Sequence, residues 1–169
     1  MAANESAAVA ACRAYASAQN TFRRTDYNNN TILEYAQQLY SASVDSDSVC
    51  RTTGGDGLYT LSNGTSTISL IDLAFAKAEG KPNGNCAPKA GYAFRIQYSD
   101  TKTVYTNTAG LMTIGFGLSA APFAYDGTGR SNFQINTMGT VYQKDCGDQT
   151  QSTVWHTNQF NVTNWAVTE

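Results

Sequence analysis

Apolar positions in the first part of the chain repeat with the period of an α-helix. Between Asn4 and Arg24 there is no Gly or Pro, and Ala, the best helix former, fills the centre. One stripe of this helix collects residues spaced three or four apart: Ala8, Ala11, Tyr15, Ala18 and Phe22. Asn4 is the expected N-cap, and Glu5 suits the positive end of the helix dipole. Because most stripe residues are small, we predict a helix over 4–24 that packs closely on a sheet or another helix.

Helical spacing recurs in two shorter segments, 32–43 and 67–79. A polar turn at 25–31 separates the first of them from the long helix, and the second is followed by Gly and Pro, which end helices. The stretch 44–66 is rich in Ser, Asp, Thr and Gly and is expected to be mostly loop. The pattern therefore predicts one or two short helices besides the long one.

From residue 91 the apolar period changes to two, which is typical of β-strands. Segment 91–98 alternates aromatic or aliphatic residues with Ala, Arg and Gln, and predicts a strand with one buried face. Further strands are expected at 111–121, 131–136 and 140–144. Helices first and antiparallel strands afterwards predict an α+β fold, in which a long N-terminal α-helix packs on a small antiparallel β-sheet. We expect a single domain over 1–169, with its antiparallel strands in 91–144.

Composition limits the classes of function. The chain has 169 residues, 41% of them apolar and 14% charged, with a net charge of -2. A small negative net charge does not favour binding to nucleic acid or to anionic lipid. No apolar run approaches the ~20 residues that cross a bilayer, and no signal peptide is recognisable.

The N-terminus and the overall composition favour an exported protein. Because the helical pattern starts at once, we interpret residues 1–3 as an expression start placed after a removed segment. A native cytoplasmic protein is the alternative. The Asn- and Thr-rich composition and the four cysteines favour export.

The cysteines are even in number and widely spaced: Cys12, Cys50, Cys86 and Cys146. They form no C-x-x-C pair, which argues against zinc fingers and thioredoxin-like chemistry. Structural disulfides are the natural interpretation in an oxidising compartment, and three pairings are open. The turn-rich surroundings favour Cys50 with Cys86. Cys12 would then pair with Cys146, or one or both would be free buried thiols.

The catalytic motifs that we searched for are absent from the sequence. There is no G-x-S-x-G elbow, Walker loop or H-E-x-x-H, and the only histidine, His156, has no identifiable partner. We therefore expect no enzyme and no catalytic or cofactor-binding residue. Aromatic residues that could bind carbohydrate or surfaces are Tyr59, Tyr125, Trp155 and Trp165, although core packing accounts for most tyrosines.

One segment after the long helix matches part of a calcium loop. Its candidate ligands lie at positions 1, 3, 5, 7 and 9 of the loop pattern: Asp26, Asn28, Asn30, Ile32 (through its carbonyl) and Glu34. Thr31 replaces the expected glycine, and Gln37 stands where a bidentate Glu is usual. Hydrogen-bonded Asx turns explain the same residues without a metal. Calcium is the one candidate cofactor.

Several segments together resemble type IV pilin-like proteins and major pseudopilins. NESAAVAACRAYASAQNTFRRTDY is similar to the second half of their first helix, through Asn4, Glu5, Ala8, Arg13, Ala18 and Gln19. LIDLAFAKAEGKP and PKAGYAFRIQ are similar to a short helix and a following strand, and PFAYDGTGRSNFQINTMGTVYQKDCG to the terminal hairpin. The combination is closest to uncharacterised exported bacterial proteins with prepilin-type N-termini.

This resemblance implies a fold and a function. The fold would be a pilin-like head whose N-terminal membrane helix has been removed, so that the membrane is reached only through that helix. The function would be that of a structural cell-envelope subunit, on the periplasmic side of the inner membrane or at the cell surface. Its partners would be pilin-like subunits or envelope and secretion-system proteins. The alternative is a secreted binding module for carbohydrate or surface ligands.

Overall fold

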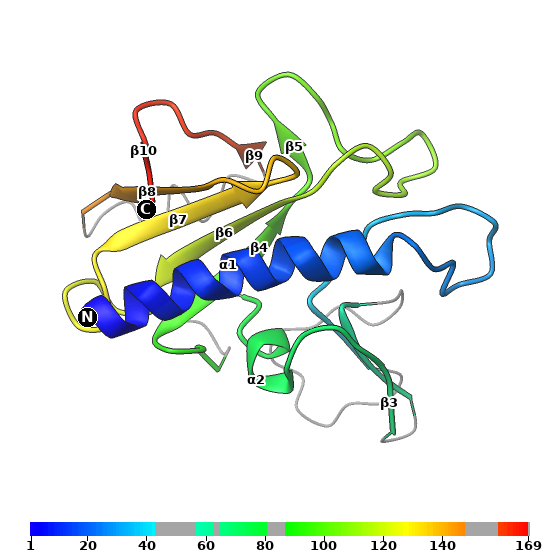
Figure 1. Cartoon of the computed structure of the whole chain (residues 1–169), viewed down its shortest axis with the longest axis horizontal. Helices are drawn as coiled ribbons and strands as arrows, with labels where there is room; N and C mark the ends of the chain where they lie inside the picture. The colour runs from blue at the N-terminus through cyan, green and yellow to red at the C-terminus, as the bar shows by residue number, and fades with distance from the viewer. Residues whose placement is uncertain (43–56, 63–64, 81–86, 148–158, 169) are drawn as a thin grey trace.

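A computed structural model describes all residues except 43–56, 63–64, 81–86, 148–158 and 169. The chain starts with one long helix and continues mainly as strands (Figure 1). In chain order the elements are α1 (Ala2–Phe22), β1 (Tyr40–Ala42), β2 (Tyr59–Ser62), β3 (Thr65–Ser69), α2 (Leu73–Ala76), β4 (Tyr92–Gln97), β5 (Ser99–Asp100), β6 (Gly117–Pro122), β7 (Ser131–Asn136), β8 (Val141–Asp145), β9 (Gln159–Phe160) and β10 (Ala166–Val167). The architecture is therefore mixed α and β, with more strand than helix.

The central element is a five-stranded antiparallel sheet in the order β10-β8-β7-β6-β4. Neighbours in the sheet follow one another along the chain, as in a meander. The register pairs Ile96 of β4 with Leu118 of β6, which in turn pairs with Ile135 of β7. Since side chains alternate between the faces of a strand, these three project from the same face. The prediction of an antiparallel sheet after the first helix is confirmed.

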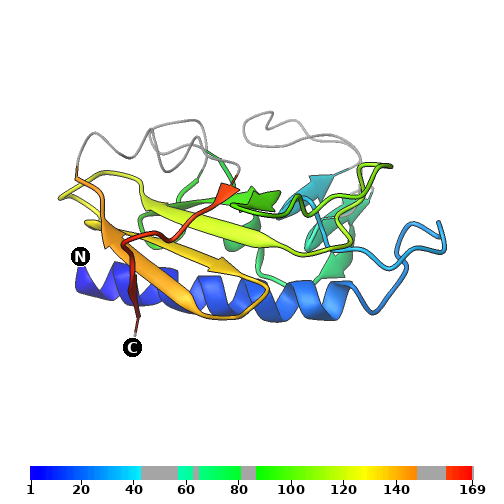
Figure 2. The same cartoon turned by 90° about the horizontal axis from the view of Figure 1, so that it is seen from above.

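The helix α1 lies along that face of the sheet (Figure 2). All five residues of the predicted stripe are buried, and Tyr15 is fully enclosed. The Tyr15 ring meets the Phe116 ring edge to face, with 5.5 Å between their centroids. The three alanines of the stripe, Ala8, Ala11 and Ala18, let the helix backbone approach the sheet closely, because an Ala side chain adds only one methyl group.

Two smaller sheets and a short helix complete the described structure. In the first sheet β1 pairs parallel with β2, and β2 pairs antiparallel with β3; in the second, β5 pairs parallel with β9. The Asp72 carboxylate caps α2 by accepting from the Phe75 N–H (2.8 Å) and forms an ion pair with Lys89. The Phe75 ring packs on Phe94 of β4, which joins α2 to the central sheet.

Several local predictions were wrong. Of the predicted helix over 32–43, the described residues 32–42 form no helix: 32–39 are irregular, and β1 follows. Of 67–79, only Leu73–Ala76 is α-helical, and its first residues belong to β3. The strand expected at 111–121 begins only at Gly117. Asn4 lies inside α1 rather than at its cap, which is Met1.

The first of these errors has a clear physical cause. The Tyr35 N–H donates to the Met112 carbonyl (2.8 Å), and Ala36 bonds through both its backbone groups to the Gln19 side chain. In a helix over 32–43, the Ala36 N–H and carbonyl would bond within the segment, whereas the Tyr35 N–H would be one of the first-turn donors without an intrahelical partner. Tertiary hydrogen bonds therefore override a helical pattern that is only about three turns long.

The strand at 91–98 differs from its prediction in another way. We expected one buried face, but β4 is buried on both faces, with only Arg95 partly exposed. Its second face carries Ala93 and Gln97, which are fully buried. Gln97 donates from Nε2 to the Gln159 carbonyl (3.0 Å), so the C-terminal segment reaches over this face.

Candidate functional site

The first turn of α1 is tied to the loop before β7 by side chains. Asn4 donates from Nδ2 to the Thr128 carbonyl (2.9 Å). The Glu5 carboxylate accepts through Oε1 from the backbone N–H groups of Arg130 (2.9 Å) and Ser131 (3.1 Å). These contacts join residues more than 120 positions apart in sequence. We call them the N-terminal clamp.

The last turns of α1 are tied to the chain by a buried glutamine. Gln19 is fully buried; its Nε2 donates to the Ala36 carbonyl (2.8 Å), and its Oε1 accepts from the Ala36 N–H (2.8 Å). The same Nε2 donates to the Tyr15 hydroxyl (2.9 Å), which donates to the Gly117 carbonyl of β6 (3.1 Å). We call these contacts the C-terminal clamp. The sequence gives no periodic signal for it, because Gln is equally common on exposed helix surfaces.

The segment predicted as a calcium loop is held together by its own hydrogen bonds. Asp26 accepts from the N–H of Asn30 through Oδ1 (3.1 Å) and from the N–H of Thr31 through Oδ2 (2.7 Å). Asn28 and Asn30 both donate from Nδ2 to Oε1 of Glu34 (2.7 and 3.2 Å). Thr31 has a φ of 66° at the position where calcium loops place glycine.

This arrangement brings the predicted ligands together but engages most of their oxygens. Asn28 and Asn30 turn amide nitrogens, which cannot bind a cation, toward Glu34. The described residues contain no group of three or more His, Cys, Asp and Glu side chains that could hold a metal ion. A calcium ion here would depend on amide and carbonyl oxygens for most of its ligands. Asx turns account for the loop in its present form, and calcium binding stays a prediction.

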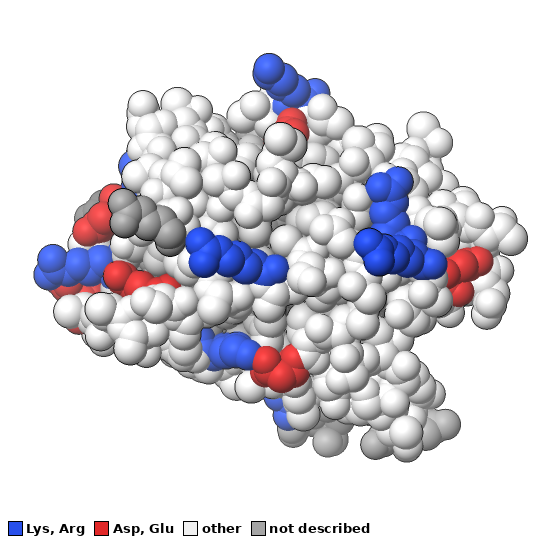
Figure 3. Space-filling model, in the orientation of Figure 1, with Lys and Arg blue, Asp and Glu red and all other residues white. Residues whose placement is uncertain are grey.

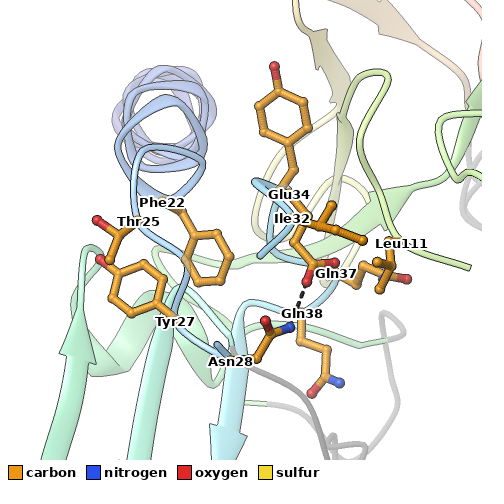
Figure 4. A pocket seen from close by; sticks show the side chains of 10 residues that line it. Phe22, Thr25, Tyr27, Asn28, Ile32, Glu34, Gln37, Gln38 and Leu111 are labelled. Carbon is orange, nitrogen blue, oxygen red and sulfur yellow. Dashed lines mark hydrogen bonds between the residues drawn. The ribbon is translucent and has the colours of Figure 1, made fainter. Parts of the chain in front are cut away.

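A cleft of about 310 Å³ opens beside this loop, where α1 ends (Figure 4). We call it the end cleft. Its aromatic walls come from Phe22, Tyr27 and Tyr35, and its polar lining includes Asn28, Glu34 and Gln37. Leu111, from the loop before β6, closes one side. Figure 4 shows the Asn28 and Glu34 side chains meeting inside it.

A second hollow, of about 440 Å³, lies where the first half of α1 meets β7 and β8. Its lining includes Glu5, Arg13 and Gln143. Glu5 already accepts two backbone N–H groups in the N-terminal clamp, so its contribution is structural. The end cleft is therefore the better candidate for a binding site.

One carboxylate outside both cavities has an unusual environment. Glu79 is half-buried between α2 and β4, and burial raises its pKa to about 7 from an ordinary 4.5. Its Oε2 accepts from the N–H groups of Leu39 (2.7 Å) and Tyr40 (3.4 Å), and Arg95 lowers its pKa in part. Glu79 thus ties the segment before β1 to the central sheet.

Charges are thinly spread over the surface that presents α1 (Figure 3). Blue and red groups touch at several places on this face, and no extended area of one sign is visible. The described ion pairs are local: Lys89 with Asp72, and Arg130 with Asp126. Among the residues that the structure describes, no helix combines the length and the apolar character that crossing a membrane requires.

The structure describes two of the four cysteines, Cys12 and Cys146. Cys12 is a fully buried thiol, and burial raises its pKa to about 12. Cys12 and Cys146 are not joined by a disulfide in the structure, and the other alternative left open by the sequence, a free buried thiol, describes Cys12. Cys50 and Cys86 lie outside the described residues.

The aromatic residues proposed for binding are mostly engaged in the fold. Tyr59 packs against Tyr40, with 6.0 Å between ring centroids, and the Tyr125 hydroxyl donates to the Asp145 carboxylate (3.1 Å). Trp165 is half-buried. Trp155 and His156 lie outside the described residues. The aromatic rings that line the end cleft are Phe22, Tyr27 and Tyr35, none of which the sequence marks as a binding residue.

Comparison with known proteins corrects the resemblance to type IV pilin-like proteins. The family whose sequence model matches this chain is described as "Protein of unknown function (DUF2950)", and the match covers residues 1–167. No curated protein and no solved structure matches the chain. The resemblance to pilins and pseudopilins rested on short motifs of common residues, and it is wrong. Over nearly its whole length, the chain belongs to the DUF2950 family.

Proposed function

We propose that this chain is a non-enzymatic structural protein of the cell envelope, exported from the cytoplasm. It would act as a rigid domain that packs against other envelope or secretion-system proteins. The observation that supports this is the pair of clamps on α1. Buried or partly buried side chains fix both ends of the 21-residue helix to segments distant in sequence.

Such clamps serve a mechanical role better than a catalytic one. Fixing a helix at both ends opposes sliding between helix and sheet, and sliding of packed elements is one of the motions by which proteins close around ligands. A load applied to α1 would then pass directly to β6 and β7, through Tyr15 and Glu5. The polar loop over 122–130 would face neighbouring proteins.

Site-specific photo-crosslinking in the native host tests this role. A photoreactive amino acid at exposed Ala124, in the loop over 122–130, should give crosslinks to envelope proteins in the membrane or surface fraction. The same group at exposed Ser17, on the outer side of α1, is the matched control and should give fewer. Recovery of the protein as an uncrosslinked monomer in the cytoplasmic fraction would contradict the proposal.

A second candidate is a binding module, and the end cleft is the observation that favours it. Its volume of about 310 Å³ lies at the small end of the range for small-molecule sites, about 300–1,000 Å³. The cleft combines aromatic rings with a carboxylate and amides, as sites for polar organic ligands do. The ligand class is argued below.

A further inference from the structure

The walls of the end cleft are fixed before any ligand arrives. The Phe22 and Tyr27 rings stack with 4.7 Å between centroids, and Asp26 holds the loop through two backbone N–H groups. On the other side, Gln37 donates from Nε2 to the Gly110 carbonyl (2.9 Å). A preformed site avoids the entropic cost of ordering side chains during binding.

Three of the polar atoms on residues that line this cleft have no hydrogen-bond partner among the described residues. Glu34 uses Oε1 for Asn28 and Asn30, which leaves Oε2 unbonded. Gln37 uses Nε2, which leaves Oε1 unbonded. No hydrogen bond engages the Tyr27 hydroxyl, whose ring is half-exposed. Two of these atoms are pure acceptors, and the third can donate or accept.

We propose that the end cleft binds a neutral saccharide of one or two rings. Its hydroxyl groups would donate to Oε2 of Glu34 and Oε1 of Gln37, and one C–H face would lie against the Tyr27 ring. Adjacent sugar hydroxyls supply several donors on a compact ring, which suits a cleft lined by two unbonded acceptors. The negative face of an aromatic ring attracts the slightly positive C–H groups of a sugar.

The charge of the cleft lining argues against charged ligands, and most strongly against anions. The described lining contains Glu34 and no Lys, Arg or His, so an anion would meet a carboxylate. The nearby Arg23 guanidinium is already engaged, because it lies over the Tyr35 ring (4.8 Å to its centroid) and donates to the Tyr35 hydroxyl (2.8 Å). A cation would be attracted to Glu34, but two amide N–H groups already satisfy part of its charge. Ile32 and Leu111 add apolar wall area that a hydrated ion would not use.

The test is an NMR titration of the full isotope-labelled chain. The neutral probes are methyl α-glucoside, methyl α-mannoside, methyl β-galactoside, N-acetylglucosamine, cellobiose and maltose, each at millimolar concentration. Glucosamine, glucuronate and calcium chloride serve as charged probes. At least one neutral saccharide should shift the amide signals of 25–38 and Leu111, and should do so more strongly than glucosamine or glucuronate.

Two variants and a control localise the binding. Glu34→Gln keeps an oxygen for Asn28 but replaces the unbonded acceptor by a donor, and it should weaken saccharide binding by about tenfold or more. Tyr27→Ala removes the ring and should weaken binding by about tenfold. Tyr125→Ala, a tyrosine outside the cleft, should leave affinity unchanged. Amide spectra outside 25–38 report whether each variant is folded.

Three results would overturn the inference. One is the absence of shifts at the cleft with every neutral saccharide. Another is saccharide binding that survives both Glu34→Gln and Tyr27→Ala in folded protein. The third is a cleft that responds only to calcium or to the charged sugars. The inference stands apart from the structural role, which the crosslinking experiment tests separately.

Discussion

At the scale of single residues, burial and hydrogen bonding have opposite effects on the pKa of Glu79. Its carboxylate accepts from the Leu39 N–H, a bond that favours the charged form, while burial favours the neutral form. Burial is the main cause of the raised pKa values of Tyr15 and Tyr98, and the charge of Glu79 adds to it. Arg95 lowers the pKa of Glu79 and so opposes the effect of its burial. Burial dominates, so the folded protein holds this proton up to about pH 7.

The raised pKa makes stability depend on pH. The unfolded chain loses the Glu79 proton near its ordinary pKa of 4.5, whereas the folded chain keeps it until about 7. Between these values the folded state binds more protons, so the stabilisation falls as pH rises through this window. The expected loss is on the order of 1–3 kcal/mol.

The variant Glu79→Gln isolates this contribution. Glutamine keeps an oxygen for the Leu39 N–H but does not titrate. In urea denaturation over pH 4 to 8, the variant should gain stability relative to the parent protein as pH rises. Parallel pH profiles for the two proteins would show that Glu79 titrates normally.

Gln19 provides a second prediction at this scale. Replacing it with Leu leaves the N–H and the carbonyl of buried Ala36 without partners. We expect a loss of about 2–4 kcal/mol of unfolding free energy in chemical denaturation. The neighbouring exposed residue gives the control, Asn20→Leu, which should change stability by less than about 0.5 kcal/mol. Equal effects of the two variants would contradict the C-terminal clamp.

At the scale of elements, the narrow stripe of α1 sets how closely the helix approaches the sheet. The stripe alternates between alanines and two large rings, Tyr15 and Phe22, which are all buried. Alanine allows the approach, while the rings fill the space between helix and sheet. The opposite side of the helix, including Arg13 and Ser17, is exposed.

A matched pair of variants tests which side of α1 faces the sheet. Ala11 is buried and Ala14 is exposed on the same helix. Ala11→Arg should cost about 3–5 kcal/mol, because it buries a charge and overfills the seam. Ala14→Arg should stay within about 0.5 kcal/mol in the same thermal or urea unfolding. Similar losses for both variants would contradict the face assignment.

At the scale of the whole molecule, the loop after α1 joins the helix layer to the small sheet that contains β1. Its Asx turns set the path of the chain from Phe22 to Tyr35, and thereby shape the end cleft. The loop also holds the residues predicted to bind calcium. A ligand here would therefore stabilise the junction between α1 and the chain that follows it.

The calcium prediction can be checked through the melting temperature. Calcium at about ten times its Kd would add about 1.4 kcal/mol, or a rise of about 3–5 °C in Tm. Magnesium at equal ionic strength is the control and should give a smaller rise, since it demands stricter geometry. Glu34→Gln should reduce the calcium effect. If calcium at millimolar concentration leaves Tm unchanged, the loop is held by its Asx turns alone.

How well the sequence pattern agrees with the structure differs from element to element. The first helix was predictable, because its stripe runs for about four turns without Gly or Pro. The strand over 131–136 was predictable from its boundaries and alternation and matches β7. The segment over 32–43 was not, because Gln19 and Met112 bond its backbone from distant parts of the chain. The resemblance to pilins failed because Ala-rich helices and short strand motifs recur in unrelated proteins.

The candidate site was predictable only in part. Asn28, Ile32 and Glu34 stood out by their spacing, and they do line the end cleft. Tyr27, Tyr35 and Leu111 did not stand out, because no local pattern says that an aromatic residue borders a cavity. The burial of Cys12 could be predicted only from its position next to the apolar stripe of the helix.

The sequence by itself determined the long first helix, its buried side and the antiparallel order of the main strands, because these follow from local periodicity. Only the tertiary structure decided how α1 is clamped at its ends and why 32–39 is not helical. It alone also decided which residues form the end cleft and that Glu79 holds its proton to about pH 7. Each of these depends on groups far apart in sequence, which no local pattern relates to one another.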